Sequence, residues 1–82
     1  MSYKDLKGEA ILITGGANGI GQSTVEAFVN LGAHVYFCDV DVKEGQKLEK
    51  KLGKKCFFTE VNLLREGEIK KWIKDSVKKA GN

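Results

Sequence analysis

Three short apolar runs alternate with longer segments in which apolar residues recur every three or four positions. The runs show no polar alternation, which is typical of strands buried on both faces of a parallel sheet. They cover residues 10–13, 35–38 and 56–59. The intervening and following segments predict helices over residues 20–31, 42–52 and 65–80. This order predicts an α/β fold of three layers, with a partial parallel sheet and flanking helices.

The helical periods also predict which side of each helix faces the core. The predicted core-facing residues are Ile20, Thr24, Phe28 and Leu31, then Val42, Gly45, Leu48 and Leu52, and then Ile69, Ile73, Val77 and Ala80 with Trp72 on the flank. Gly32 and Gly53 follow the first two helices and predict their ends. Asp41 and Glu44 have the spacing of a capping box at the start of the second helix.

The connections between these elements are short, which restricts the topology. Right-handed crossovers give the strand order 3-2-1, place the first two helices on one face and send the third to the other. The first strand then has an open outer side. We therefore expect the isolated chain to self-associate through Ala10–Thr14, or to be stable only beside further chain.

Residues 14–21, Thr-Gly-Gly-Ala-Asn-Gly-Ile-Gly, connect the first predicted strand to the first helix. The glycines at 15, 16, 19 and 21 can adopt positive φ and leave the main chain accessible to a ligand. A helix that opens near Ile20 favours an anion through its unpaired amides and its dipole. The segment predicts a site for the diphosphate of a dinucleotide; the alternative is an ordinary turn between strand and helix.

The spacing Thr14-Gly15-x-x-x-Gly19-x-Gly21 resembles the cofactor turn of the short-chain dehydrogenase/reductase family. An acidic residue, Asp39, ends the second predicted strand about 20 residues later, as in other dinucleotide-binding folds. The resemblance implies that residues 1–82 form the N-terminal half of an NAD(P)-binding Rossmann domain. It also implies an oxidoreductase that interconverts an alcohol and a carbonyl by hydride transfer.

In this family a serine and a Tyr-x-x-x-Lys pair carry catalysis, and they follow the cofactor-binding half. We expect the sequence to stop before that segment, to contain no catalytic residue and to be inactive alone. The full protein would be an NAD-dependent enzyme, a homo-oligomer, and would act on a small-molecule alcohol or carbonyl.

The resemblance assigns the diphosphate to the main chain of the glycine turn. Gly15, Gly19 and Gly21 are predicted to carry it, and the main chain of Asn18 and Ile20 to point at it. Asn18 also tolerates a left-handed turn, which is an equally simple reason for an asparagine at this position.

Asp39 is predicted to accept hydrogen bonds from both hydroxyls of the adenosine ribose and to repel a 2'-phosphate. No lysine or arginine occurs in the turn, and Val40 rather than a basic residue follows Asp39, so NAD is predicted over NADP. The alternative is that Asp39 merely precedes the capping residue Asp41.

Glu60 and Val61 stand where the family has an aspartate and an apolar residue that hold the adenine. Glutamate is one methylene longer than aspartate. A main-chain contact from Val61 is therefore expected, while Glu60 could equally be a surface glutamate.

The chain of 82 residues is shorter than most domains, and its 41% hydrophobic and 30% charged residues are ordinary for a soluble globular protein. The formal net charge is +3, and most lysines follow Asp41. Lysines spaced along helices usually form a solvated face, so a nucleic-acid partner ranks last. The polar N-terminus and the short apolar runs predict neither a secretory signal nor a membrane span, and hence a cytoplasmic protein.

The remaining candidate residues predict structure rather than chemistry. Cys38 and Cys56 would lie about three residues out of register, near 10 Å apart, which is too far for a disulfide. Neither cysteine has metal-ligand spacing, so no metal site is predicted. His34 would lie at the opposite end of the sheet from the cofactor, and Phe57 and Phe58 are predicted to pack in the core.

Three other functional classes were alternatives to a dehydrogenase. A P-loop hydrolase is excluded because no Gly-Lys-Ser/Thr follows the turn. A methyltransferase would have an acidic residue just before its glycine loop, where this chain has Thr14. A module that binds NAD(H), or a protein partner, without catalysis stays open as the alternative function.

Overall fold

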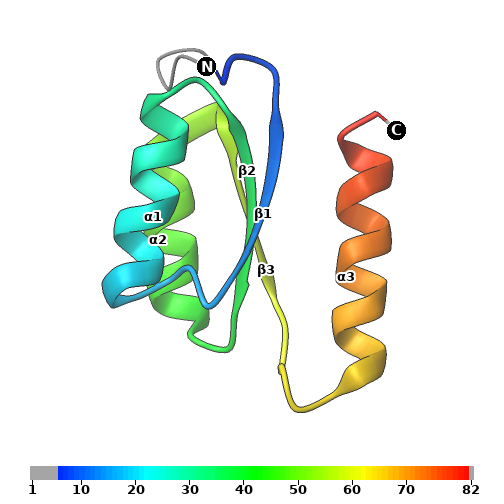
Figure 1. The fold of residues 1–82 in the computed structure, drawn as a ribbon. Coiled ribbons are helices and arrows are strands. Elements are labelled where there is room, and N and C mark those ends of the chain that lie inside the picture. Colours follow the sequence, from blue (N-terminus) through cyan, green and yellow to red (C-terminus); the bar gives the residue numbers. More distant parts are fainter. Residues whose placement is uncertain (1–5, 82) are drawn as a thin grey trace.

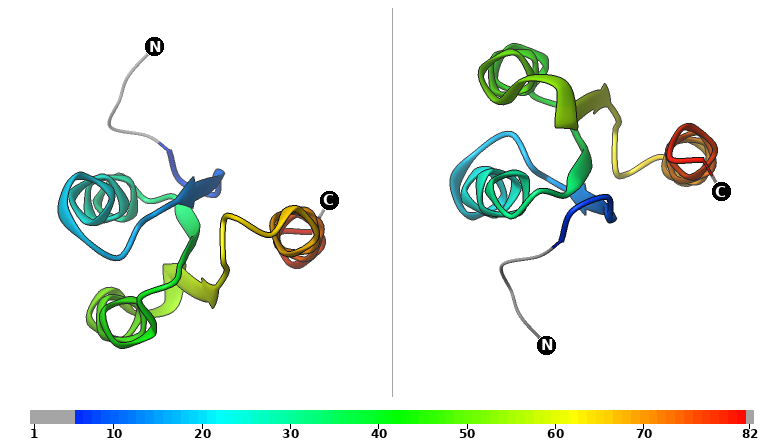
Figure 2. Two further views of the ribbon diagram at one scale, coloured as in Figure 1. Left: turned by 90° about the horizontal axis from the view of Figure 1, so that it is seen from below. Right: turned by 90° about the horizontal axis from the view of Figure 1, so that it is seen from above.

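The computed structural model describes residues 6–81, in which three strands alternate with three α-helices. The elements are β1 (Ala10–Thr14), α1 (Gly19–Asn30), β2 (His34–Asp39), α2 (Val42–Leu52), the 3-10 turn η1 (Gly53–Lys55), β3 (Cys56–Glu60) and α3 (Glu66–Lys79). The strands form a parallel sheet in the order β1-β2-β3. Helices α1 and α2 cover one face and α3 covers the other (Figure 1, Figure 2). The predicted fold class, strand order and helix sides are confirmed.

The sheet separates two apolar clusters. The cluster beneath α1 and α2 contains the buried residues Ala17, Val25, Ala33, Val35, Phe37, Leu48 and Cys56. The cluster beneath α3 contains Tyr36, Cys38, Val61 and Trp72. Because side chains alternate along a strand, residues 35–38 of β2 supply two buried side chains to each cluster. The central strand is therefore buried on both faces, as its apolar run predicts, whereas β1 and β3 are partly exposed.

The core-facing side of α1 differs from the prediction. Val25 is fully buried and Phe28 and Val29 pack against the core, whereas Ile20 is 87% exposed. A Cβ at Gly21 would collide with the carbonyl oxygen of Gly15. This close approach of helix to turn sets the rotation of α1, and it directs Ile20 away from the sheet.

The core-facing side of α3 is also rotated relative to the prediction. Trp72 and Ser76 are buried, with 4% and 5% exposure, and Ile69 and Ala80 flank the cluster. Ile73 and Val77 are 43% and 39% exposed. Placing Trp72 on the flank was wrong, because the indole has the largest apolar surface on the helix and its burial decides which side faces the sheet.

Helix α2 follows its predicted pattern. The carboxylate of Asp41 accepts the amide of Glu44 at 3.1 Å and caps the helix. In a complete capping box the side chain of Glu44 would accept the amide of Asp41. Here that amide donates to the carboxylate of Asp39 instead, at 3.0 Å. Gly45 and Leu48 are buried, and a Cβ at Gly45 would meet the ring of Phe58.

Strand β3 forms one edge of the sheet, and part of that edge is covered from within the chain. The amide of Phe58 donates to Oε2 of Glu49 at 2.8 Å, and the amide of Cys56 donates to the carbonyl of Gly53. Edge strands with unpaired amides invite pairing with another chain. The expected self-association through β1, which forms the other edge, stays a prediction.

The two cysteines are buried free thiols. In the sheet register Val35 pairs with Cys56 and Cys38 pairs with Thr59, so the thiols lie three positions out of register, as predicted. Burial raises the pKa of Cys38 to about 11, and burial together with the charge of Glu49 raises the pKa of Cys56 to about 12.

Gly45→Ala is expected to lower the free energy of unfolding by about 1–3 kcal/mol, because the added methyl group must displace the Phe58 ring or push α2 off the sheet. Urea unfolding monitored by circular dichroism measures this change. Gly67→Ala is the matched control, since the site in α3 has open space around it and alanine favours helix. A Gly45→Ala variant as stable as the wild type would show that the contact is not tight.

Raising the pH is expected to destabilise the fold through the thiols. Their folded pKa values exceed the ordinary value of 9.0, so their contribution is complete below pH 9.0 and is lost as the pH rises toward 11 and 12. We expect each thiol to lower the free energy of unfolding by on the order of 2 kcal/mol between about pH 8 and about pH 10.5. Urea titrations at both pH values measure it, and the loss should be smaller in Cys56→Ala. An equal loss of stability in Cys56→Ala would show that the thiol of Cys56 does not cause the pH dependence.

Candidate functional site

The three parallel strands end at the same edge of the sheet, and the predicted site residues gather there. The loops after β1 and β2 lead into α1 and α2, and the loop after β3 leads into α3 (Figure 1). Carboxyl ends of parallel strands are where ligands bind in open α/β sheets. The turn of residues 15–18, the Asp39–Asp41 turn and the Glu60–Val61 pair therefore surround one region.

The glycines of the first turn serve two different purposes. Gly15 and Gly19 have φ of +71° and +58°, which other residues rarely adopt. Gly16 and Gly21 do not have positive φ, contrary to expectation. A Cβ at Gly16 would approach Phe37 and Val25 to 2.8 and 2.9 Å, and one at Gly21 would strike the turn itself. These two glycines allow close packing instead.

The N-terminus of α1 is open. Asn18 occupies the N-cap position with extended backbone (φ −137°, ψ 157°), so its predicted alternative role in a left-handed turn is wrong. Its side chain makes no capping hydrogen bond, and no acidic residue lies in the first turn. Within residues 6–81, no acceptor takes the amides of Gly19, Ile20 or Gly21. These amides and the helix dipole together favour an anion.

Asp39 bridges the first two turns. Its Oδ2 accepts the amide of Ala17 at 3.1 Å, and its Oδ1 accepts the amide of Asp41 at 3.0 Å. Neither bond was predicted from the sequence. Each carboxylate oxygen has a second lone pair, so both can still accept a ligand hydroxyl.

A second tie between the turns involves Asp41. Nδ2 of Asn18 donates to Oδ2 of Asp41 at 2.9 Å. This bond and the amide of Glu44 hold the pKa of Asp41 below its ordinary value, so the carboxylate is ionised at neutral pH. Asp41 therefore caps α2 and also restrains the side chain of Asn18.

Glu60 and Val61 occupy different environments. Glu60 pairs with Asp39 in the sheet register and is exposed, whereas Val61 is 2% exposed and packs beneath α3. The amide of Val61 donates to the carbonyl of Asp39 at 3.1 Å. The main-chain contact from Val61 to an adenine stays a prediction. If the amide of Val61 made that contact, it would have to give up its bond to Asp39.

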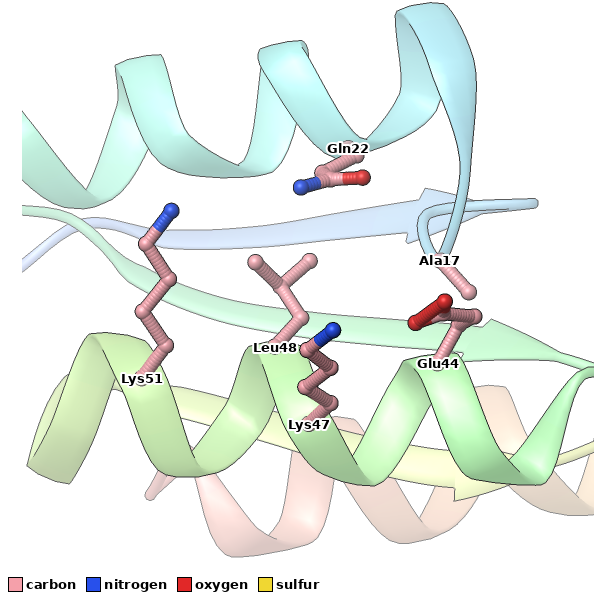
Figure 3. A pocket seen from close by; sticks show the side chains of 6 residues that line it. All are labelled: Ala17, Gln22, Glu44, Lys47, Leu48 and Lys51. Atoms are coloured by element: carbon pink, nitrogen blue, oxygen red, sulfur yellow. The ribbon is translucent and has the colours of Figure 1, made fainter.

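A hollow of about 270 Å³ lies between α1 and α2 (Figure 3). Its lining residues are Ala17, Gln22, Glu44, Lys47, Leu48 and Lys51. Gln22 donates to Glu26 at 3.1 Å, and the ammonium group of Lys51 lies 3.7 Å from the same carboxylate. Polar side chains of both helices thus line the groove, and none of the sequence-predicted site residues does.

The other candidate residues lie away from this region. His34 begins β2 and pairs with Ala10, at the opposite end of the sheet, as predicted. Phe57 stacks on Tyr36 with ring centroids 4.8 Å apart, and Phe58 packs against Phe37 at 5.2 Å, which confirms their packing role. The described residues contain no cluster of histidine, cysteine and acidic side chains suited to a metal ion.

One pair does have the Tyr-x-x-x-Lys spacing, namely Tyr3 and Lys7. It precedes β1, whereas the pair of the family follows the cofactor-binding half, so it does not correspond to that pair. Tyr3 lies outside the described residues. No helix within residues 6–81 has the length and apolar content needed to traverse a bilayer.

Comparison with known proteins places the chain among dehydrogenases and reductases. A family model described as short chain dehydrogenase matches residues 9–82. Tropinone reductase-like 2 of Erythroxylum coca is 38% identical over 79 residues, which are 96% of this chain and 29% of that protein. The 3-hydroxyacyl-CoA dehydrogenase type-2 of Rattus norvegicus is 40% identical over 68 residues, 83% of this chain and 26% of that protein.

A similar solved structure is the 3-ketoacyl-(acyl-carrier-protein) reductase from Brucella melitensis complexed with NADH. It superposes with a TM-score of 0.89 at 23% identity, over 95% of this chain and 32% of that one. At this identity the likeness establishes the fold. The chain spans less than a third of the length of each of these three proteins.

Asp39→Ala is expected to lower the free energy of unfolding by about 1–2 kcal/mol without any ligand, because two amides lose their acceptor. The amides of Ala17 and Asp41 should then exchange faster with solvent, as NMR hydrogen exchange measures. Asp75→Ala, at an exposed position of α3, is the control and should change stability by less than about 0.5 kcal/mol. Unchanged exchange at Ala17 would count against the bridge.

Proposed function

Because the chain belongs to the short-chain dehydrogenase family, we propose that it is the dinucleotide-binding part of an NAD-dependent oxidoreductase that interconverts an alcohol and a carbonyl by hydride transfer. The names of the relatives support this proposal, since they are reductases and dehydrogenases. The full protein would act in the cytoplasm as a homo-oligomer on a small-molecule alcohol or carbonyl.

The observation that carries the proposal is the open N-terminus of α1 beside the glycine turn. The amides of Gly19, Ile20 and Gly21 have no acceptor within the described residues. A diphosphate has the charge and the acceptor oxygens that these amides and the helix dipole favour. Gly15 and Asn18 complete the turn, with their main chain as the binding surface.

The preference for NAD is proposed from Asp39 and its neighbours. The free lone pairs of Asp39 can accept the two hydroxyls of an adenosine ribose, and its charge would repel a 2'-phosphate. Val40 is 60% exposed next to it and offers no positive charge, and residues 14–21 contain no lysine or arginine. Glu60 and the main chain of Val61 are proposed to adjoin the adenine.

NAD supplies the hydride chemistry when it is bound, and the role proposed for these residues is to bind and orient it. Tyr36 is 4% exposed and stacked on Phe57 within the core, which suits a packing role. The burial of Tyr36 is equally compatible with the second candidate function, a module that binds NAD(H) without catalysis. Turnover of an alcohol by the full protein would distinguish the two functions.

Calorimetric titration of NAD and NADP tests the proposal. The wild type should prefer NAD by about tenfold or more, because the bonds of a ribose to a carboxylate are charge-assisted. Asp39→Asn removes the charge and should narrow the preference to less than about threefold. Asp75→Asn makes the same change on α3 and should leave the ratio of the NAD and NADP affinities unchanged. Equal affinities in the wild type would contradict the NAD preference, and the absence of saturable binding would refute the dinucleotide site.

A further inference from the structure

The residue at the N-cap of α1 has its side chain turned away from the helix it precedes. Asparagine is among the preferred N-cap residues because its carboxamide oxygen can accept the amide two or three positions later. For Asn18 these amides belong to Ile20 and Gly21. The structure shows no such bond, and the carboxamide group donates to Asp41 instead, at 2.9 Å.

Two contacts of its own hold Asp41 in position for this bond. Its Oδ1 accepts the amide of Glu44 at 3.1 Å, and its amide donates to Asp39 at 3.0 Å, which leaves Oδ2 to accept from Asn18. The carboxylate is therefore fixed at the start of α2. A bond from an amide to an ionised carboxylate is stronger than one between neutral groups.

We propose that Asp41 is a positioning residue for the dinucleotide, which acts by holding the side chain of Asn18 away from the amides of Ile20 and Gly21. The assignment rests on the proposed function. A diphosphate and the carboxamide oxygen of Asn18 would use the same two amides. With Asp41 in place these amides are open; without it Asn18 can cap its own helix and the ligand must displace that cap.

Asp41→Ser tests the assignment. Serine is a good N-cap residue and can still accept the amide of Glu44, so α2 should keep its cap, while its shorter side chain does not reach Asn18. Without ligand, the amides of Ile20 or Gly21 should become more protected in NMR hydrogen exchange. The affinity for NAD, measured by calorimetry, should fall about fivefold, which corresponds to an ordinary N-cap interaction.

The same substitution in an Asn18→Ala background is the control. With no carboxamide at residue 18, changing Asp41 to serine should alter the affinity for NAD by less than about twofold. If Asp41 had a purely structural role, the substitution would lower the affinity by the same factor in both backgrounds. Adenosine, which carries no diphosphate, should bind the wild type and Asp41→Ser alike.

The outcomes separate this assignment from the proposed function. If the wild type binds NAD and Asp41→Ser binds it as tightly, the assignment falls and the proposed function stands. If the loss persists in the Asn18→Ala background, Asp41 acts by another route and the assignment also falls. If the wild type shows no saturable binding of NAD, both fall together.

Discussion

The carboxylate of Asp39 joins the two turns from which the site is built. One oxygen accepts the amide of Ala17 in the turn after β1, and the other accepts the amide of Asp41 in the turn after β2. A single side chain can reach both because the two strands are parallel neighbours that end at the same edge. The residue that we propose to bind the ribose is therefore also the residue that joins the two loops.

Much of the fold could be predicted because burial on both faces leaves an unusual sequence pattern. The apolar run at residues 35–38 has no polar alternation, and the structure places it in the centre of the sheet. The handedness of crossovers then determines the strand order and the sides of the helices. The face of α2 could also be predicted, since Asp41 fixes its start and Gly45 and Leu48 follow at helical spacing.

The rest depends on contacts that a periodic pattern does not encode. In α1 and α3 two overlapping sets of apolar residues both have helical spacing, and a local contact determines which set faces the sheet. For α1 it is the approach of Gly21 to the carbonyl of Gly15, and for α3 it is the burial of Trp72. The bond between Asn18 and Asp41 joins residues 23 positions apart across two turns, and no spacing along the chain predicts it.

The two edges of the sheet differ in what they offer to another strand. At β3 the amides of Cys56 and Phe58 already have acceptors, in Gly53 and in the carboxylate of Glu49. Among residues 6–81 no strand pairs with the outer side of β1. A further strand could therefore form main-chain hydrogen bonds directly with β1, whereas at β3 it would first have to displace the carboxylate of Glu49.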